Sequence, residues 1–266
     1  MKIVAFGGGH GLGASLRALR RCADLAAGDG ERWQLTAVVT VGDNGGSSGR
    51  LRQHRDVLPP GDLRQALVAL AGDDPYSTTT AALFQYRFDG DDGLAGHPVG
   101  NLVLCGLMEQ LGDPVAALDH AAAMIGAAGR VLPMSRRPVA IEADVRGADP
   151  DRPDEVVTVR GQHEVAVSTG QVEAVRLVPA APPACREAVA AVAEADWLVF
   201  GPGSWYTSVI PHLLVPELAA AVLASPARRM IILNLTTDQE TVGMTVPDHL
   251  AALAAAAPGR RAALVL

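Results

Sequence analysis

The chain has 266 residues, and its 22 basic and 29 acidic side chains give a formal net charge of −7. The acidic balance argues against binding to nucleic acid or to anionic membranes. No apolar run approaches the roughly 18 residues of a membrane-spanning helix, and the short apolar start does not resemble a signal peptide. We therefore expect no membrane span and a cytoplasmic location.

Lysine and cysteine usage excludes several chemistries. Lys2 is the only lysine, whereas a Walker loop, a Schiff-base enzyme and a pyridoxal enzyme each need a lysine in mid-chain. Cys22, Cys105 and Cys185 are odd in number and widely spaced, which argues against a disulfide framework or a structural zinc site. An anion would therefore be bound by arginine, by a metal ion or by a helix N-terminus.

The first fifty residues predict the opening of a parallel α/β sheet. A buried strand over 2–6 precedes a glycine-rich loop and an amphipathic helix. A second β-branched run over 35–41 leads into another glycine-rich loop. Ligands of such sheets bind at the carboxyl ends of the strands, which is where both loops lie.

The remaining patterns predict one α/β domain over 1–266, with a mostly parallel sheet flanked by helices. Residues 138–178 alternate apolar and polar side chains, which predicts a small antiparallel strand excursion within it. The other expected elements are helices over 63–70, 78–88, 101–111, 114–125, 185–194 and 247–257, and strands over 197–200, 230–233 and 262–266. Because the chain ends inside a predicted strand, we expect a C-terminal segment to be missing.

The first loop, Gly9-His10-Gly11-Leu12-Gly13-Ala14, fits the pattern G-x-G-x-x-[GA] between a strand and a helix. Backbone without Cβ atoms approaches a ligand closely, and the helix N-terminus presents unpaired N–H groups to an anion. The alternative is a glycine turn that merely joins strand to helix.

The second loop, Asp43–Arg50, is more specific because it combines a carboxylate, three glycines, two hydroxyls and an arginine at a strand end. The hydroxyls of Ser47 and Ser48 suit phosphate oxygens, and Arg50 supplies a bidentate charge. Asp43 is placed to hold either a ribose hydroxyl or a hard cation such as Mg²⁺. A flexible polar loop is the alternative.

Three later segments add polar groups beside predicted elements. Asp62 and Arg64 open a helix, and Asp62 suits an N-cap as well as a ligand. Asn101 is open between contacting a base or sugar hydroxyl and capping its own helix, and His97 between a ligand contact and a plain loop residue. A third loop places glycines and hydroxyls after a buried strand, followed by an asparagine after the next strand: Gly201, Gly203, Ser204, Thr207, Ser208 and Asn234. Three such loops at strand ends predict one ligand site.

Searches for other chemistry find little. The sequence contains no Gly-x-Ser-x-Gly nucleophile elbow and no His-x-x-x-His metal spacing. No pair of residues identifies a general base, so no catalytic residue is named.

Five motifs follow one another along the chain: Gly7–Leu12, Val41–Arg52, Leu58–Arg64, Gly96–Leu102 and Gly201–Ser208. Together they resemble the YvcK-type gluconeogenesis factors, a branch of the CofD-like superfamily, and the resemblance spans essentially the whole chain. It implies a Rossmann-like core that binds a nucleotide diphosphate sugar, with UDP-N-acetylglucosamine expected, and a role in cell shape and envelope synthesis during gluconeogenic growth. The other branch transfers a phospholactyl group from a guanosine diphosphate ester to a deazaflavin, using Mg²⁺.

The motifs and the resemblance together predict nucleotide contacts from Gly8, Gly9, His10, Gly11, Leu12, Asp43, Asn44, Gly45, Gly46, Ser47, Ser48, Arg50, Asp62, Arg64, Asn101, Gly201, Gly203, Ser204, Thr207, Ser208 and Asn234. The chain departs from the family pattern at three places. Asp43-Asn44 replaces a pair of aspartates, His10 replaces a threonine, and residues 236–240 replace a Met-Thr-Gln-rich loop. The lost carboxylate weakens a metal-dependent transferase reading.

Three functions follow from this sequence. The leading hypothesis is a UDP-sugar-binding regulator that acts through a protein partner in envelope synthesis and needs no cofactor. The alternative is a phospholactyl-type transferase with Mg²⁺ on Asp43, and with Asp62 as a second candidate ligand. An NAD-linked oxidoreductase is disfavoured, because the second glycine loop occupies the place where the ribose-binding acid usually acts. Homodimerisation is left open.

Overall fold

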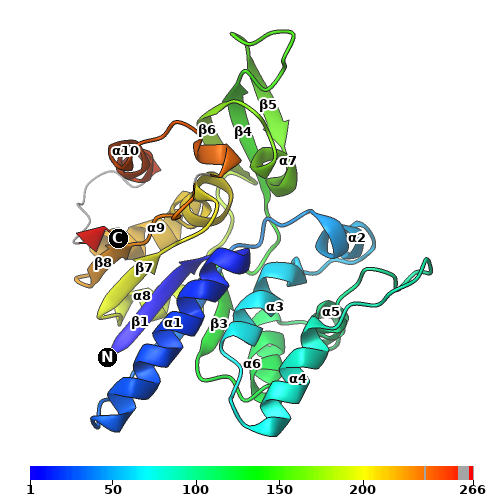
Figure 1. The fold of residues 1–266 in the computed structure, drawn as a ribbon, viewed down its shortest axis with the longest axis vertical. Coiled ribbons are helices and arrows are strands. Elements are labelled where there is room, and N and C mark those ends of the chain that lie inside the picture. The colour runs from blue at the N-terminus through cyan, green and yellow to red at the C-terminus, as the bar shows by residue number, and fades with distance from the viewer. Residues whose placement is uncertain (237, 257–263, 266) are drawn as a thin grey trace.

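The protein was analysed as a computed structural model, which describes residues 1–236, 238–256 and 264–265. In these residues the main sheet has six strands, each parallel to its neighbours, in the order β3-β2-β1-β7-β8-β9 (Figure 1). They are β1 Lys2–Gly7, β2 Gln34–Val39, β3 Arg130–Pro133, β7 Trp197–Phe200, β8 Arg228–Ile231 and β9 Leu264–Val265. Counted along the chain, this order is 3-2-1-4-5-6, the doubly wound order of the Rossmann fold. The predicted α/β class and Rossmann-like sheet are confirmed.

The central strands form because they are almost wholly apolar. In β1 the side chains from Ile3 to Phe6 are at most 4% exposed, as expected for a parallel strand covered on both faces. Phe6 pairs in register with Phe200 of β7, and their rings stack with centroids 4.7 Å apart. This contact fixes the two strands between which the strand order reverses.

Helices cover both faces of the sheet (Figure 1). α1 Gly9–Gly28 and α3 Pro60–Ala69 pack together on one face, and α8 Arg186–Ala193 and α9 Pro216–Ala224 pack together on the other. The other long helices are α2 Gly46–His54, α4 Pro75–Gln85, α5 Val99–Leu111, α6 Pro114–Met124 and α10 Val246–Ala256.

The helices predicted after residue 60 all occur, with ends shifted by at most three residues. Two shifts have a clear cause: Pro60 and Pro75 each occupy the first turn of a helix, where a missing N–H costs nothing. The sequence analysis missed β3 and α9 and treated the start of α2 as loop. Residue 257 of a predicted helix, and all of the predicted strand 262–266 except 264–265, lie outside the described residues.

The predicted antiparallel excursion is also confirmed. β4 Ala140–Arg146 lies between β5 Val156–Arg160 and β6 Gln171–Val178. A short helix that was not predicted, α7 Gln162–Ala166, connects β5 to β6. This unit has a small core of its own, and in Figure 1 it stands above the carboxyl ends of the main sheet. It therefore covers the edge where the loops were expected to meet.

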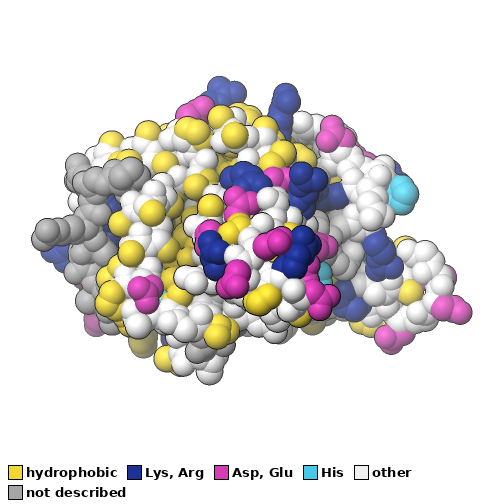
Figure 2. Space-filling view, turned by 90° about the horizontal axis from the view of Figure 1, so that it is seen from above, with side chains coloured by type: hydrophobic (Ala, Val, Ile, Leu, Met, Phe, Trp, Pro, Cys, Tyr) yellow, Lys and Arg dark blue, Asp and Glu magenta, His cyan; other side chains and the backbone are white. Residues whose placement is uncertain are grey.

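The outer surface of the antiparallel sheet is charged. Figure 2 shows positive and negative side chains interspersed over it. Arg176 pairs with Glu142 at 3.0 Å and with Asp144 at 2.8 Å, and Arg146 pairs with Glu173 at 2.6 Å. Exposed pairs contribute little stability individually, but charge on a small sheet discourages edge-to-edge association.

Among the described residues, no single helix has the length and hydropathy of a membrane-spanning segment. Two consecutive helical segments, Trp205–Leu214 and Pro216–Ala224, reach that length and hydropathy only when they are counted together, and the chain bends sharply between them.

Gly11→Ala should destabilise the protein by about 1–3 kcal/mol, because a Cβ there would lie 2.7 Å from the Cα of Gly203, a backbone atom. Gly28→Ala is the matched control in the same helix, since no atom lies within 4 Å of its added Cβ. The control should leave stability unchanged or raise it by up to about 1 kcal/mol. Urea denaturation measures both, and equal effects would contradict the close approach.

Candidate functional site

The loops after β1 and β7 meet at the point where the strand order reverses, which is the ligand-binding crevice of doubly wound sheets. Gly11, in the first turn of α1, packs directly against Gly203 of the β7 loop. The N–H of Gly203 donates to Oδ1 of Asn234 at 2.9 Å, and Nδ2 of Asn234 donates to the carbonyl of Gly203 at 3.2 Å. Three strand ends therefore contribute to one site.

This crevice contains a hollow of about 410 Å³, here called the switch-point hollow. It is lined by Gly8, Gly9, His10, Gly11, Asp43, Asp62, Gln162, His163, Ala166, Gly203, Ser204, Thr207, Ser208, Asn234 and Asp238. Gly8 is the N-cap of α1 and has no side chain, and the carboxylate of Asp62 accepts a hydrogen bond from the N–H of Gly9. The α1 end of the hollow therefore offers the backbone N–H groups of His10 and Gly11.

A second hollow of about 280 Å³ lies beside the N-terminus of α2 and is called the α2 hollow. It is lined by Gly9, His10, Asp43, Gly45, Gly46, Ser47, Ser48, Gly61, Asp62, Arg64, Gln65, Arg87, Asn101 and His163. Five residues line both hollows: Gly9, His10, Asp43, Asp62 and His163. The two hollows are therefore parts of one groove.

The structure brings most of the predicted contact residues to this groove. Of those expected from the sequence, all line one of the two hollows except Leu12, Asn44, Arg50 and Gly201. Leu12 is buried in the core, and the carbonyl of Gly201 accepts a hydrogen bond from Ser15 at 2.8 Å. These two residues support the loops from behind the hollows.

Asn44 fixes the antiparallel unit over the groove. Its Oδ1 accepts from the N–H of His163 at 3.0 Å, and its Nδ2 donates to Glu164 at 2.8 Å. An aspartate at this position would face Glu164 with a second negative charge. An amide suits this position, because it accepts from one group and donates to the other, whereas an ionised carboxylate can only accept.

Arg50 lies outside the groove. Because α2 already begins at Gly46, Arg50 is exposed on the helix, and its Nη2 donates to the carbonyl of Ala95 at 2.7 Å. The arginines that line the α2 hollow are Arg64, which was predicted, and Arg87, which was not. Nothing in the residues around Arg87 distinguishes it from other loop arginines.

Neither Asp62 nor Asn101 is the N-cap of its helix, although the sequence left that alternative open for both. α3 begins at Pro60 with Pro59 as its N-cap, so Asp62 lies inside the first turn and accepts from the Thr40 hydroxyl at 3.1 Å. α5 begins at Val99 with Pro98 as its N-cap, and Asn101 lies inside that helix.

A buried chain of hydrogen bonds joins three of the sequence motifs. Nε of Arg64 donates to Oδ1 of Asn101 at 2.9 Å, and Nδ2 of Asn101 donates to the hydroxyl of Ser47 at 2.9 Å. The same hydroxyl lies 2.8 Å from Nδ1 of His97. All four side chains are at most 7% exposed, so the network holds the α2 hollow in one arrangement. His97 is thus a positioning residue in this network.

A family model described as 2-phospho-L-lactate transferase CofD matches residues 3–266. The chain belongs to the CofD family. It is 54% identical to the putative gluconeogenesis factor of Mycobacterium tuberculosis, over 97% of this chain and 72% of that protein. It is 38% identical to the gluconeogenesis factor of Halalkalibacterium halodurans, over 94% of this chain and 72% of that one. The predicted resemblance to the gluconeogenesis factors is confirmed.

A crystal structure of a UPF0052-family protein from Bacillus halodurans has the same fold. It is similar to this chain with a TM-score of 0.86 and 36% sequence identity, covering 99% of this chain and 79% of that one.

Two carboxylates dominate the electrostatics of this CofD-family groove. The Asp43 carboxylate lies beside the first turn of α3, which contains Asp62. A Cβ added to Gly61 in this turn would lie 2.8 Å from Oδ2 of Asp43. Burial, and next the negative charge of Asp43, raise the pKa of Asp62 to about 6. The described residues contain no cluster of three or more His, Cys, Asp or Glu side chains able to hold a metal ion. A cation here would depend on these two carboxylates together with ligand phosphates.

A third acidic group, Glu240, lies behind the switch-point hollow. The N–H of Tyr206 donates to its Oε2 at 2.8 Å, and the Thr207 hydroxyl also donates to its carboxylate. Both donors belong to the π-helical turn Trp205–Val209, whose other side lines the hollow. Burial raises the pKa of Glu240 to about 7. No motif or pattern in the sequence pointed to this buried carboxylate.

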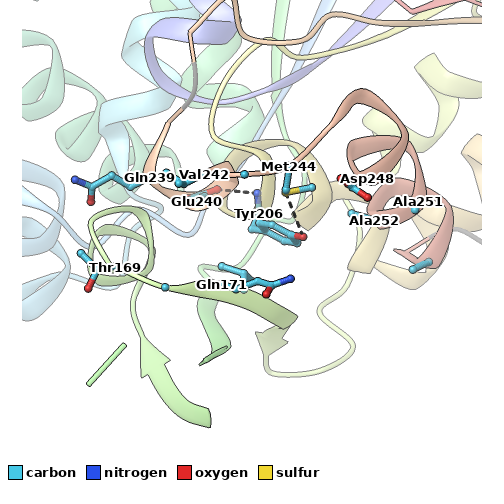
Figure 3. A pocket seen from close by; sticks show the side chains of 14 residues that line it. Thr169, Gln171, Tyr206, Gln239, Glu240, Val242, Met244, Asp248, Ala251 and Ala252 are labelled. Atoms are coloured by element: carbon cyan, nitrogen blue, oxygen red, sulfur yellow. Dashed lines mark hydrogen bonds between the residues drawn. The ribbon is translucent and has the colours of Figure 1, made fainter. Parts of the chain in front are cut away.

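Glu240 also borders a separate cavity of about 870 Å³, which lies between α10, the start of β6 and residues 239–244. Figure 3 shows Tyr206 between Glu240 and Met244, with Thr169 and Gln171 on the opposite wall. The Tyr206 hydroxyl donates to the sulfur of Met244 at 3.8 Å. Tyr206 and Glu240 thus form the wall between this cavity and the turn that lines the switch-point hollow.

Asp43→Asn should lower the pKa of Asp62 from about 6 toward its ordinary value of 3.8 without reaching it, because burial remains. The amide keeps the acceptor that Gly45 N–H uses at 2.9 Å. Carboxyl ¹³C chemical shifts followed against pH measure the change. An Asp62 titration that is identical in both proteins would show that the two charges do not interact.

Glu240→Gln should remove a pH dependence of stability. Between pH 4.5 and about 7 the folded protein keeps a proton on Glu240 that the unfolded chain releases, so this group's contribution to the free energy of unfolding falls as the pH rises through that window. The free energy of unfolding of the variant, relative to that of the wild type, should rise by up to about 3 kcal/mol from pH 4.5 to 8. Urea denaturation at both pH values measures it, with the exposed Glu217→Gln as control; parallel profiles would contradict the expectation.

Proposed function

We propose that the groove binds a nucleotide diphosphate sugar of the UDP-N-acetylglucosamine type. The observation that supports this most directly is the N-terminus of α1, which faces the hydroxyl-bearing loop of β7 across the contact between Gly11 and Gly203. A helix N-terminus that meets a glycine-rich loop at the switch point is a general arrangement for a pyrophosphate. The hollow of about 410 Å³ lies within the size range of small-ligand pockets.

The polar groups along the groove fit the parts of such a ligand. The backbone N–H groups of His10 and Gly11 and the hydroxyls of Ser204 and Ser208 suit the diphosphate. Asp43 and Asp62 accept hydrogen bonds when ionised, which suits sugar hydroxyls at the border of the two hollows. Binding of this kind needs no metal ion or other cofactor.

The proposed biological role is a cytoplasmic regulator of cell shape and envelope synthesis during gluconeogenic growth, acting through a protein partner. The gluconeogenesis factors of M. tuberculosis and H. halodurans, which this chain resembles over at least 94% of its length, support the link to gluconeogenesis by their names. α7 connects the groove to the antiparallel unit through Asn44, so a bound ligand would contact the same unit that carries the charged outer surface.

A transferase remains the second candidate, favoured by one specific observation. Asp43 and Asp62 interact closely enough that Asp43 raises the pKa of Asp62, and a divalent cation would relieve this repulsion while bridging to a diphosphate. The matching family model, described as a 2-phospho-L-lactate transferase, agrees with that chemistry. In this reading Asp43 and Asp62 hold Mg²⁺, which would supply charge to a phosphoryl-type group.

Ser204→Asp should weaken binding of UDP-N-acetylglucosamine at least tenfold, about 1.4 kcal/mol, because it puts a negative charge beside the diphosphate. The matched Ser204→Ala should change affinity less than threefold. Calorimetric titration with UDP-N-acetylglucosamine and with GDP, each with and without Mg²⁺, measures this. Binding of GDP only with Mg²⁺, and its loss in Asp43→Asn, would favour the transferase; no binding of either nucleotide would overturn both.

A further inference from the structure

Arg64 is a buried charge that forms no ion pair with a carboxylate of the described residues, although the negative charge of Asp62 lies near enough to raise its pKa against the effect of burial. Its side chain is 4% exposed, and Asn101, a neutral amide, accepts from its Nε. Within the described residues, no group accepts a hydrogen bond from its two terminal nitrogens and no carboxylate forms an ion pair with it. These nitrogens belong to a residue that lines the α2 hollow. A buried cation whose donors lack hydrogen-bond acceptors lowers the stability of the fold unless another group compensates its charge.

The same hollow receives the N-terminus of α2, a helix of nine residues. Gly45 is its N-cap, and its first turn contains no acidic residue and no described side-chain cap. The N–H groups at this end therefore face the hollow with the positive end of the helix dipole. The Ser48 hydroxyl accepts from the N–H of Gly61 at 3.0 Å, which leaves its own proton to donate.

A second arginine reinforces the positive charge. Arg87 lines the α2 hollow and donates to the carbonyl of Gly96. Burial, and next the positive charge of Arg87, lower the pKa of Arg64 to about 10. The two guanidinium groups therefore lie close enough to repel each other, and an anion between them would relieve that repulsion.

The titratable groups on the other side of the hollow set its polarity. Asp43, Asp62, His10 and His163 lie at the border with the switch-point hollow. The groove thus has an acidic middle and a basic end. Because Asp43 and Asp62 also line the α2 hollow, an anion there would have to bind on the side of the two arginines.

We propose that the α2 hollow is an oxyanion subsite that binds a phosphate or carboxylate group, in addition to the diphosphate expected in the switch-point hollow. Arg64 supplies a guanidinium already fixed by Asn101, Arg87 supplies a second cation, and the α2 N-terminus supplies backbone donors. The bound phosphate or carboxylate group is either part of the nucleotide ligand, at the end away from its diphosphate, or a separate anion that binds beside that ligand. The biological use of the subsite rests on the proposed function, but anion binding itself does not.

The direct test uses inorganic phosphate as the probe, titrated by calorimetry and by ³¹P NMR. Arg87→Met and Arg64→Met should each weaken phosphate binding at least tenfold. Arg50→Met, which removes the same charge outside the groove, should change it less than twofold. Since Arg64 is buried, circular dichroism checks that the Arg64→Met variant folds. Arg87 is more exposed, so the Arg87→Met variant tests the proposal even if Arg64→Met does not fold. Phosphate binding that is absent, or that ignores both arginines, overturns the proposal.

A second measurement identifies the source of the acid. UDP-glucuronic acid carries a carboxylate that UDP-glucose lacks. If UDP-glucuronic acid binds at least fivefold more tightly than UDP-glucose, and Arg87→Met abolishes this difference, the acidic group belongs to the nucleotide ligand. Equal binding of the two, with phosphate still dependent on Arg87, places it on a separate molecule. If neither nucleotide binds while phosphate still depends on Arg87, the proposed function fails and the subsite stands.

Discussion

The approach of two backbones at the switch point is the constraint on which the site depends. Gly11 of α1 touches the β7 loop at Gly203, and a side chain on Gly11 would collide with that backbone. The stacked rings of Phe6 and Phe200 hold the two strands side by side. This contact brings a helix N-terminus and a hydroxyl-bearing loop to the same crevice. Every other group in the groove is placed relative to this pair.

Local patterns were enough to predict most of the fold. Continuous apolar runs identified β1, β2 and β7, since parallel strands covered on both faces carry no polar alternation. The alternating pattern of residues 138–178 identified an antiparallel unit. The strand β3 was missed because it has only two apolar residues, Val131 and Leu132, between an arginine and a proline, and α9 because its alanine-rich sequence has no clear polar face.

The candidate site was predictable to the extent that it is made of loops at strand ends. Glycine and hydroxyl motifs placed Gly8, Ser47 and Ser204 at the groove, as the structure does. Side-chain direction was not predictable: Arg50 and Arg64 look equivalent in sequence, but only Arg64 has a buried partner, Asn101, that fixes it toward the hollow. Contacts of this kind join residues far apart in the chain, so no local pattern announces them.

The amide at Asn44 has a consequence for the attachment of α7. Its two hydrogen bonds, to the N–H of His163 and to Glu164, are made by a group that neither gains nor loses a proton. The contribution of residue 44 to the attachment of this helix is therefore the same at every pH. With an aspartate in that place, the attachment of α7 would have depended on the protonation state of residue 44.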